Sequence, residues 1–188
     1  MMKELSLHIL DIAENSVSAN AKTVSIEVEE DSQNNLLTII ITDDGKGMDA
    51  EMLARVTDPF TTTRTTRKVG LGIPFFKEAA EACNGHFAIA STPGRGTRVE
   101  ASFQRDHIDR MPMGSIQTTF LDLLVGFPDI HWKFKYRIDE EEFDFDSEPV
   151  RKTLDGIPYS DPTVLKYLKD EIDFGIQKIQ SVHKQEMP

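Results

Sequence analysis

A mostly apolar segment that ends in two acidic residues and two glycines most constrains what this chain can fold into. Residues 36–42 predict a buried strand, and the run Asp43-Asp44-Gly45-Lys46-Gly47 must end it. A carboxylate at the end of a strand can accept a hydrogen bond from an exocyclic amine, and glycines let a flat ring approach the backbone. An ordinary turn after a strand has the same composition, so this motif alone leaves both interpretations open.

A second pair of glycines comes just before another predicted helix. The segment Gly70-Leu71-Gly72-Ile73 precedes Pro74, which suits the first turn of a helix that we expect to run to about Cys83. Unpaired amides and the dipole at a helix N-terminus favour anions, so this segment is a candidate phosphate site. A helix start beside a basic surface loop is the alternative. Upstream side chains that could add phosphate contacts are Thr61, Thr62, Thr63, Arg64, Arg67 and Lys68.

The first predicted helix, residues 5–20, carries a polar stripe. His8, Asp11 and Asn15 recur at helical spacing. A carboxylate and a carboxamide on adjacent turns could hold a hydrated divalent cation, since Mg²⁺ prefers oxygen ligands and keeps several waters. A solvated polar helix face is the alternative. A separate stripe, which we expect to face the core, consists of Leu10, Ala13 and Val17.

The remaining periodicity predicts a chain of short elements. Asn20 is expected to end the first helix in a left-handed conformation, and Asn84-Gly85 to end the helix that begins at Pro74. Residues 57–72 lack periodicity and predict a loop. Further strands are expected at 23–29, 86–90 and 97–103, and a helix capped by Asp49 at about 49–56.

The character of the sequence changes after about residue 106. Trp132, Phe134 and Tyr136 alternate along a predicted strand, which indicates a core face. Before this tail, Cys83 is expected to be a buried, inert thiol. The expected elements of this tail are a linker at 106–114, a helix at about 115–125, strands at 131–138 and 142–145, and a last helix from Pro162.

Composition and the distribution of apolar residues argue against several function classes. The 188 residues carry a formal net charge of −11, which disfavours nucleic-acid binding because that needs a basic surface. No apolar stretch approaches the ~20 residues of a membrane span, and the N-terminal residues do not resemble a signal peptide. A single cysteine fits a reducing compartment. We therefore expect a cytoplasmic protein that does not bind a membrane.

Five motifs stand in an order that resembles the gyrase, chaperone, histidine-kinase and mismatch-repair (GHKL) ATPases. The resemblance covers residues 5–104. Asp11-Ile12-Ala13-Glu14-Asn15-Ser16 is similar to the N box, and Asp43 to Met48 to the first glycine box. Asp58-Pro59-Phe60-Thr61-Thr62-Thr63-Arg64 is similar to the F box of sensor kinases, Gly70-Leu71-Gly72-Ile73 to the second glycine box, and Ser91 to Thr97 to the final turn.

The resemblance implies both a fold and a ligand. The fold is a two-layer α/β (α+β) sandwich of the Bergerat type, a mixed sheet with helices on one face, at residues 1–105. Residues 106–188 are expected to add a small C-terminal α/β subdomain. The implied ligands are ATP and Mg²⁺, with Asn15 coordinating the metal, Asp43 binding the adenine amine, and residues 60–72 forming a lid. The implied nucleotide-binding residues are Asn15, Asp43, Gly45, Gly47, Met48, Phe60, Thr61, Thr62, Thr63, Lys68, Gly70, Leu71, Gly72 and Thr97.

Two departures from the family pattern bear on catalysis. Asp11 stands where the hydrolysing branches have a glutamate that orients water, and its side chain is one methylene shorter, so slow hydrolysis is expected. His8 lies within the N-box segment, and no phosphoacceptor hairpin of the sensor-kinase type is expected. The chain could therefore be a nucleotide-dependent regulator of a partner protein, or a kinase or slow ATPase acting on one. A non-catalytic interaction module that keeps ATP as a structural ligand is the alternative, and no oligomeric state is assigned.

Overall fold

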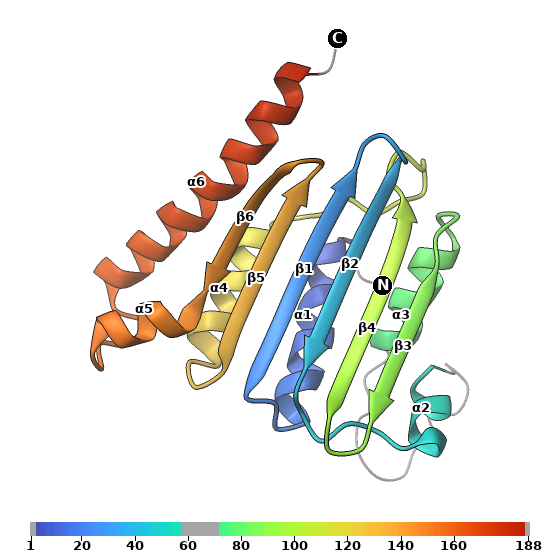
Figure 1. Cartoon of the computed structure of the whole chain (residues 1–188), viewed down its shortest axis with the longest axis horizontal. Coiled ribbons are helices and arrows are strands. Elements are labelled where there is room, and N and C mark those ends of the chain that lie inside the picture. The colour runs from blue at the N-terminus through green and yellow to red at the C-terminus, as the bar shows by residue number, and fades with distance from the viewer. Residues whose placement is uncertain (1–2, 58–71, 187–188) are drawn as a thin grey trace.

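The computed structural model describes residues 3–57 and 72–186 (Figure 1). Within these residues, the strands are β1 (Thr23–Asp31), β2 (Leu36–Asp43), β3 (Phe87–Thr92), β4 (Gly96–Gln104), β5 (His131–Ile138) and β6 (Glu141–Asp146). The helices are α1 (Leu5–Ser18), α2 (Ala50–Val56), α3 (Gly72–Glu81), α4 (Ile116–Gly126), α5 (Ser147–Leu154) and α6 (Pro162–Glu186). None of the helices in this part of the chain combines the length and apolar character needed to cross a bilayer.

The strands form one mixed sheet in the order β3-β4-β2-β1-β5-β6. Every neighbouring pair is antiparallel except β1 and β5, which run parallel. The segment after residue 106, which we expected to be a subdomain, thus adds β5 and β6 to the sheet of the preceding residues. Parallel strands need a long crossover, and the chain between β4 and β5, including α4, provides it.

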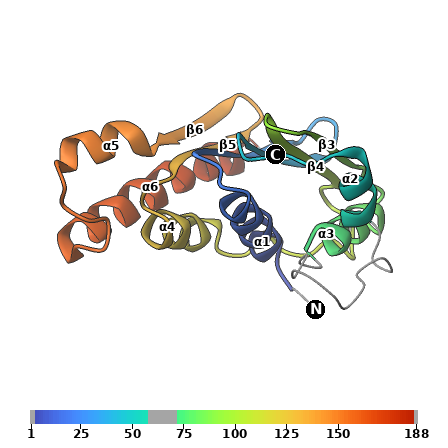
Figure 2. The same ribbon diagram turned by 90° about the horizontal axis from the view of Figure 1, so that it is seen from below.

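The architecture is a sheet with helices against one face (Figure 2). α1, α3, α4 and α6 lie on that face, and the strands turn alternate apolar side chains towards them. Trp132, Phe134 and Tyr136 are at most 2% exposed, which confirms the predicted core face of β5. Cys83 is buried as expected. The mixed α+β sandwich predicted from the sequence is therefore the fold of this chain.

The predicted core face of α1 is wrong in part. Leu10 and Val17 are only half-buried, and the buried apolar residues of α1 are Leu5, Ile9, Ile12 and Ala13. His8 was placed on the polar stripe, but it is 1% exposed and stacks on Phe76 of α3, with ring centroids 5.4 Å apart. The physical reason is that α1 lies between α3 and α4 (Figure 2), so its flanks are covered as well as its sheet-facing side.

Most boundaries fall within two residues of those expected. Asn20 and Asn84 have φ of 59° and 53°, which confirms Asn20 as left-handed and shows that Asn84 adopts the same conformation after α3. α5 was missed because its first half carries Pro149 and few apolar residues. Its signals are the Asp146 cap, whose carboxylate accepts the Glu148 amide, followed by that proline in the first turn.

Candidate functional site

A cavity of about 550 Å³ lies at the end of the sheet where β2 leads into α2 (Figure 1). α1 contributes Asn15 and Ser16 to its wall, β2 contributes Asp43, and β4 contributes Thr97. Apolar side chains of α1, α2, α3, β2 and β4 complete the wall, namely Ile12, Met52, Val56, Ile73, Ile41 and Val99. Apolar walls with a few convergent polar groups suit a flat heterocycle that carries a polar edge.

The Asp43 carboxylate is the buried polar centre of this cavity. The side chain is 8% exposed, and Oδ2 accepts the Ser16 hydroxyl at 2.7 Å. Oδ1 accepts the amides of Gly45 at 2.8 Å and of Thr97 at 3.3 Å. A carboxylate has about four acceptor positions, so these donors orient it and leave capacity for a further donor from a ligand.

Two turns, each with a glycine at positive φ, lie at the polar end of the cavity. Gly47 has φ of +65°, and a Cβ there would lie 2.0 Å from the Thr92 carbonyl oxygen. A Cβ on Gly96, at φ of +96°, would lie 1.9 Å from the Asp43 carbonyl oxygen. Both positions therefore require glycine, because any side chain would collide with backbone in a conformation that already disfavours it. The turn after β2 and the β3–β4 turn can then pack directly on each other.

Asn15 and Asp11 lie one turn apart on α1 but have different surroundings. Asn15 lines the cavity, and its carboxamide makes no hydrogen bond to another described residue, so its oxygen is available to a ligand or a hydrated cation. The Asp11 carboxylate lies against the start of α3, where a Cβ on Gly72 would be 1.5 Å from its Oδ2. Burial raises the pKa of Asp11, and its Oδ2 has no hydrogen-bond partner among the described residues.

His8 belongs to the α1–α3 contact rather than to the cavity wall. Neither ring nitrogen has a hydrogen-bond partner within the described part of the chain, and burial lowers the pKa of the imidazole. A neutral ring is therefore favoured, and it contributes mainly packing against Phe76.

The remaining predicted site residues divide into two groups. Gly45, Gly47, Met48 and Thr97 meet at the cavity's polar end, and Gly72 is the first residue of α3. The others lie outside the described residues: Phe60, Thr61, Thr62, Thr63, Lys68, Gly70 and Leu71, together with Arg64 and Arg67.

Sequence reasoning missed two hydroxyls at this site. Ser16 directly follows Asn15 on α1 and donates to Asp43. Ser91 contacts both Met48 and Thr97 from β3. Ser16 could have been found, because helical spacing from Ile12 places it on a buried face. Ser91 begins the segment that resembles the final turn, but its role could not be read from spacing, because that role depends on the pairing of β3 with β4.

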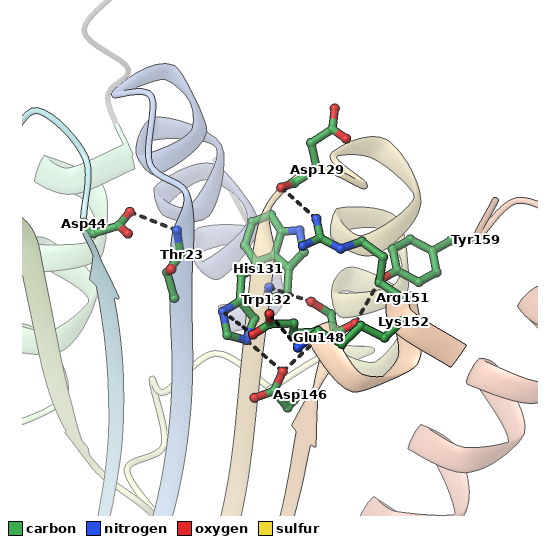
Figure 3. Close-up of polar contacts among 11 residues, drawn as sticks. Thr23, Asp44, Asp129, His131, Trp132, Asp146, Glu148, Arg151, Lys152 and Tyr159 are labelled. Carbon is green, nitrogen blue, oxygen red and sulfur yellow. Dashed lines mark hydrogen bonds and ion pairs between the residues drawn. The ribbon is translucent and has the colours of Figure 1, made fainter. Parts of the chain in front are cut away.

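A second polar cluster lies at the same end of the sheet, across β1 (Figure 3). The Asp44 carboxylate accepts the amides of Lys22 and Thr23 at 2.7 and 2.9 Å, which ties the turn after β2 to the start of β1. On the neighbouring β5, His131 Nε2 lies 2.7 Å from Asp146 Oδ1. These contacts join elements of the sheet, and Asp44 therefore serves the turn rather than the cavity.

The family comparison agrees with this geometry. A family model described as histidine kinase-, DNA gyrase B- and HSP90-like ATPase matches residues 2–107. The chain belongs to this ATPase family. The match contains α1, the turn after β2 and the β3–β4 turn, which are the elements that build the cavity.

The proteins to which this chain is similar include sensor kinases. The chain is 37% identical over 89 residues to the sensor protein kinase FleS of Pseudomonas aeruginosa, covering 47% of this chain and 22% of FleS. It is 32% identical over 111 residues to the non-motile and phage-resistance protein of Caulobacter vibrioides, covering 54% of this chain and 13% of that protein. The chain thus spans less than a quarter of the length of these relatives.

Solved structures share the fold. The Aquifex aeolicus MutL ATPase domain complexed with ADP matches with a TM-score of 0.51 at 12% identity, covering 82% of this chain and 70% of that domain. The N-terminal domain of a DNA repair protein matches with a TM-score of 0.54 at 13% identity, covering 77% of this chain and 52% of the other. At these identities the likeness concerns the fold alone.

Proposed function

We propose that this chain binds ATP with Mg²⁺ and uses the nucleotide to regulate, or to phosphorylate, a partner protein. The observation that carries the proposal is the buried Asp43 carboxylate, which is oriented by Ser16 and two amides at the apolar cavity of a histidine kinase-like ATPase domain. Adenine offers a flat face to the apolar wall and an amine to the remaining acceptor capacity of Asp43.

The metal would be held at Asn15. Its carboxamide oxygen is a hard ligand of the kind that Mg²⁺ prefers, and Asn15 lines the cavity one turn from Asp11. When bound, Mg²⁺ would neutralise charge on the phosphate oxygens. Within the chain itself, the N-terminus of α3 would favour the phosphate anions, because the first amides of a helix have no intrahelical partner and its dipole is positive there.

Asp11 is the candidate group that orients the attacking oxygen. Its side chain is one methylene shorter than the glutamate expected at this position. It lies against Gly72, and its Oδ2 has no partner among the described residues. Orientation of the attacking group is a large part of catalysis by positioning, and the shorter carboxylate fits slow turnover. The same observation favours the second candidate function, a non-catalytic module that keeps ATP as a structural ligand.

Asp43→Asn tests the adenine pocket. The asparagine carboxamide can present an N–H group to the adenine amine, where the Asp43 carboxylate presents only acceptors. ATP should therefore no longer raise the melting temperature measured by thermal denaturation. Asp44→Asn is the matched control, since the Asp44 carboxylate binds the amides of Lys22 and Thr23. Unchanged ATP stabilisation in the Asp43 variant would refute the assignment of this pocket.

Asn15→Ala and an ADP-release assay test the later steps. Asn15→Ala should remove the difference between ATP affinities measured with Mg²⁺ and with a chelator. Glu14→Gln, at an exposed position of α1 outside the residues that line the cavity, should keep that difference. ADP release that rises above background with a candidate partner supports the kinase or ATPase function. ATP binding without any turnover leaves the structural-ligand function.

A further inference from the structure

Ser91 connects two of the segments that build the cavity. Met48 and Thr97 line the cavity wall, whereas Ser91 does not. Its hydroxyl oxygen accepts the Met48 amide at 2.8 Å. It also lies 3.0 Å from the Gly96 carbonyl oxygen and 2.9 Å from the Thr97 hydroxyl, which is directly opposite across the β3–β4 pair. All these partners belong to the turns at the polar end of the cavity.

The number of available protons fixes which hydroxyl donates in the contacts among Ser91, Gly96 and Thr97. A serine hydroxyl has one proton to donate, and a carbonyl oxygen can only accept. Both short contacts of Ser91 are hydrogen bonds only if Ser91 donates to the Gly96 carbonyl and Thr97 donates to Ser91. The opposite direction would leave the Gly96 oxygen close to an oxygen with no proton between them. Thr97 then has no proton left for a ligand.

We propose that Ser91 is a positioning residue that sets base preference by holding the Thr97 hydroxyl as an acceptor towards the cavity. Asp43 also presents only acceptors there, since an ionised carboxylate carries no proton. The polar wall then matches a purine with an amino group at position 6 and opposes one with an oxo group, directly or through a bridging water. This inference rests on the proposed nucleotide binding and extends it to a residue outside the wall.

The test compares ADP with IDP, both of which avoid turnover. ADP has an amino group at position 6 and an unprotonated N1, whereas IDP has an oxo group at position 6 and a proton on N1. Isothermal titration calorimetry on the full chain gives both dissociation constants for each variant. The wild type should prefer ADP. In Ser91→Ala the Thr97 proton is released and can be donated to the oxo group, so the ADP-to-IDP preference should fall by roughly tenfold, the scale of one hydrogen bond. Any general weakening caused by the freed Met48 amide affects both ligands and cancels in the ratio.

Further variants separate this role from a merely structural one. Ser102→Ala is the matched control, because Ser102 also bonds across β3 and β4, to the backbone of His86 at the far end of the pair. Its ratio should equal that of the wild type. Ser91→Thr retains the hydroxyl and should keep the preference. Thr97→Val should reduce the preference, and adding Ser91→Ala to it should cause no further change in the ratio.

The possible outcomes decide between the inferences. An unchanged ratio in Ser91→Ala overturns the role of Ser91, whatever the ratio in Thr97→Val, while leaving nucleotide binding intact. Additive losses in the double variant also overturn it, because Ser91 would then act independently of Thr97. If the wild type binds neither nucleotide, the proposed function fails and this inference fails with it. Should Ser91→Ala not fold, Ser91→Cys takes its place, because a thiol is a weak donor and a weak acceptor and should also lower the ratio.

Discussion

The hydrogen bond from Ser16 to Asp43 should be a measurable part of the stability of the nucleotide-free protein. The Ser16 hydroxyl is 2.7 Å from Asp43 Oδ2, and the two side chains are 3% and 8% exposed. A hydrogen bond to a charged group contributes about 1.5–3 kcal/mol. Asp43 keeps two backbone donors in Ser16→Ala, so the lower half of that range, about 1.5–2 kcal/mol, is expected.

Urea denaturation measures this loss directly. For a chain of this length, about 1.5–2 kcal/mol corresponds to a fall of roughly 3–8 °C in melting temperature. The loss should depend on the charge of Asp43, so the double variant Ser16→Ala/Asp43→Asn should show positive coupling with the single variants. ADP should restore part of the loss, since the adenine amine supplies a donor to the same carboxylate.

Two results would refute this reasoning. If Ser16→Ala costs the same free energy in the wild-type and Asp43→Asn backgrounds, the hydroxyl acts through packing alone. If Ser16→Ala instead raises ADP affinity, Ser16 competes with the ligand for Asp43 rather than orienting it. Ser18→Ala, an exposed serine half a turn away on α1, is the control for changes in helix propensity.

Two further predictions concern buried groups outside the cavity. Burial lowers the pKa of His8 below its ordinary 6.5, so the unfolded chain binds a proton that the folded chain does not. The free energy of unfolding should therefore fall as the pH drops below about 6.5. The fall should be smaller in His8→Phe, which keeps the ring stacked on Phe76. The Glu30 carboxylate accepts hydrogen bonds from the Tyr136 hydroxyl at 2.6 Å and from Arg105 Nε at 2.8 Å. Glu30→Ala should therefore lower the free energy of unfolding measured by urea denaturation by about 2 kcal/mol, and Glu30→Gln should lower it clearly less.

The site shows where sequence-based reasoning reaches its limit. The position of Asp43, Gly45 and Gly47 at the end of a strand could be predicted from the residues, because an apolar strand must end at this polar, glycine-rich run. Their binding role came only from the family resemblance. The role of Ser91 could not be predicted, because its partners are 43 and 6 residues away in the chain, and they meet only through strand pairing. His8 was misplaced because periodicity gives the spacing of a helix face but not how many neighbours cover the helix.

The burial of the residues after 106 could be predicted from the sequence, but their place in the sheet could not. The alternating aromatic residues of β5 predicted a core face, and their burial confirms it. Which core they enter was not predictable, since an alternating strand can pair at any free sheet edge with a matching apolar face. The parallel pairing of β5 with β1 decides it, and Glu30 at the end of β1 bonds Tyr136 of β5 across this junction.

By itself, the sequence determined the order of the elements, the turns that only glycine can form, and the carboxylate that ends β2. These features are local, because they follow from backbone conformations and side-chain spacing over a few residues. Tertiary structure alone decided which hydroxyls orient Asp43 and Thr97, why Asp11 lies against Gly72, and where the tail joins the sheet. Those contacts join residues distant in the chain, and only close packing and the pairing of buried polar groups select them.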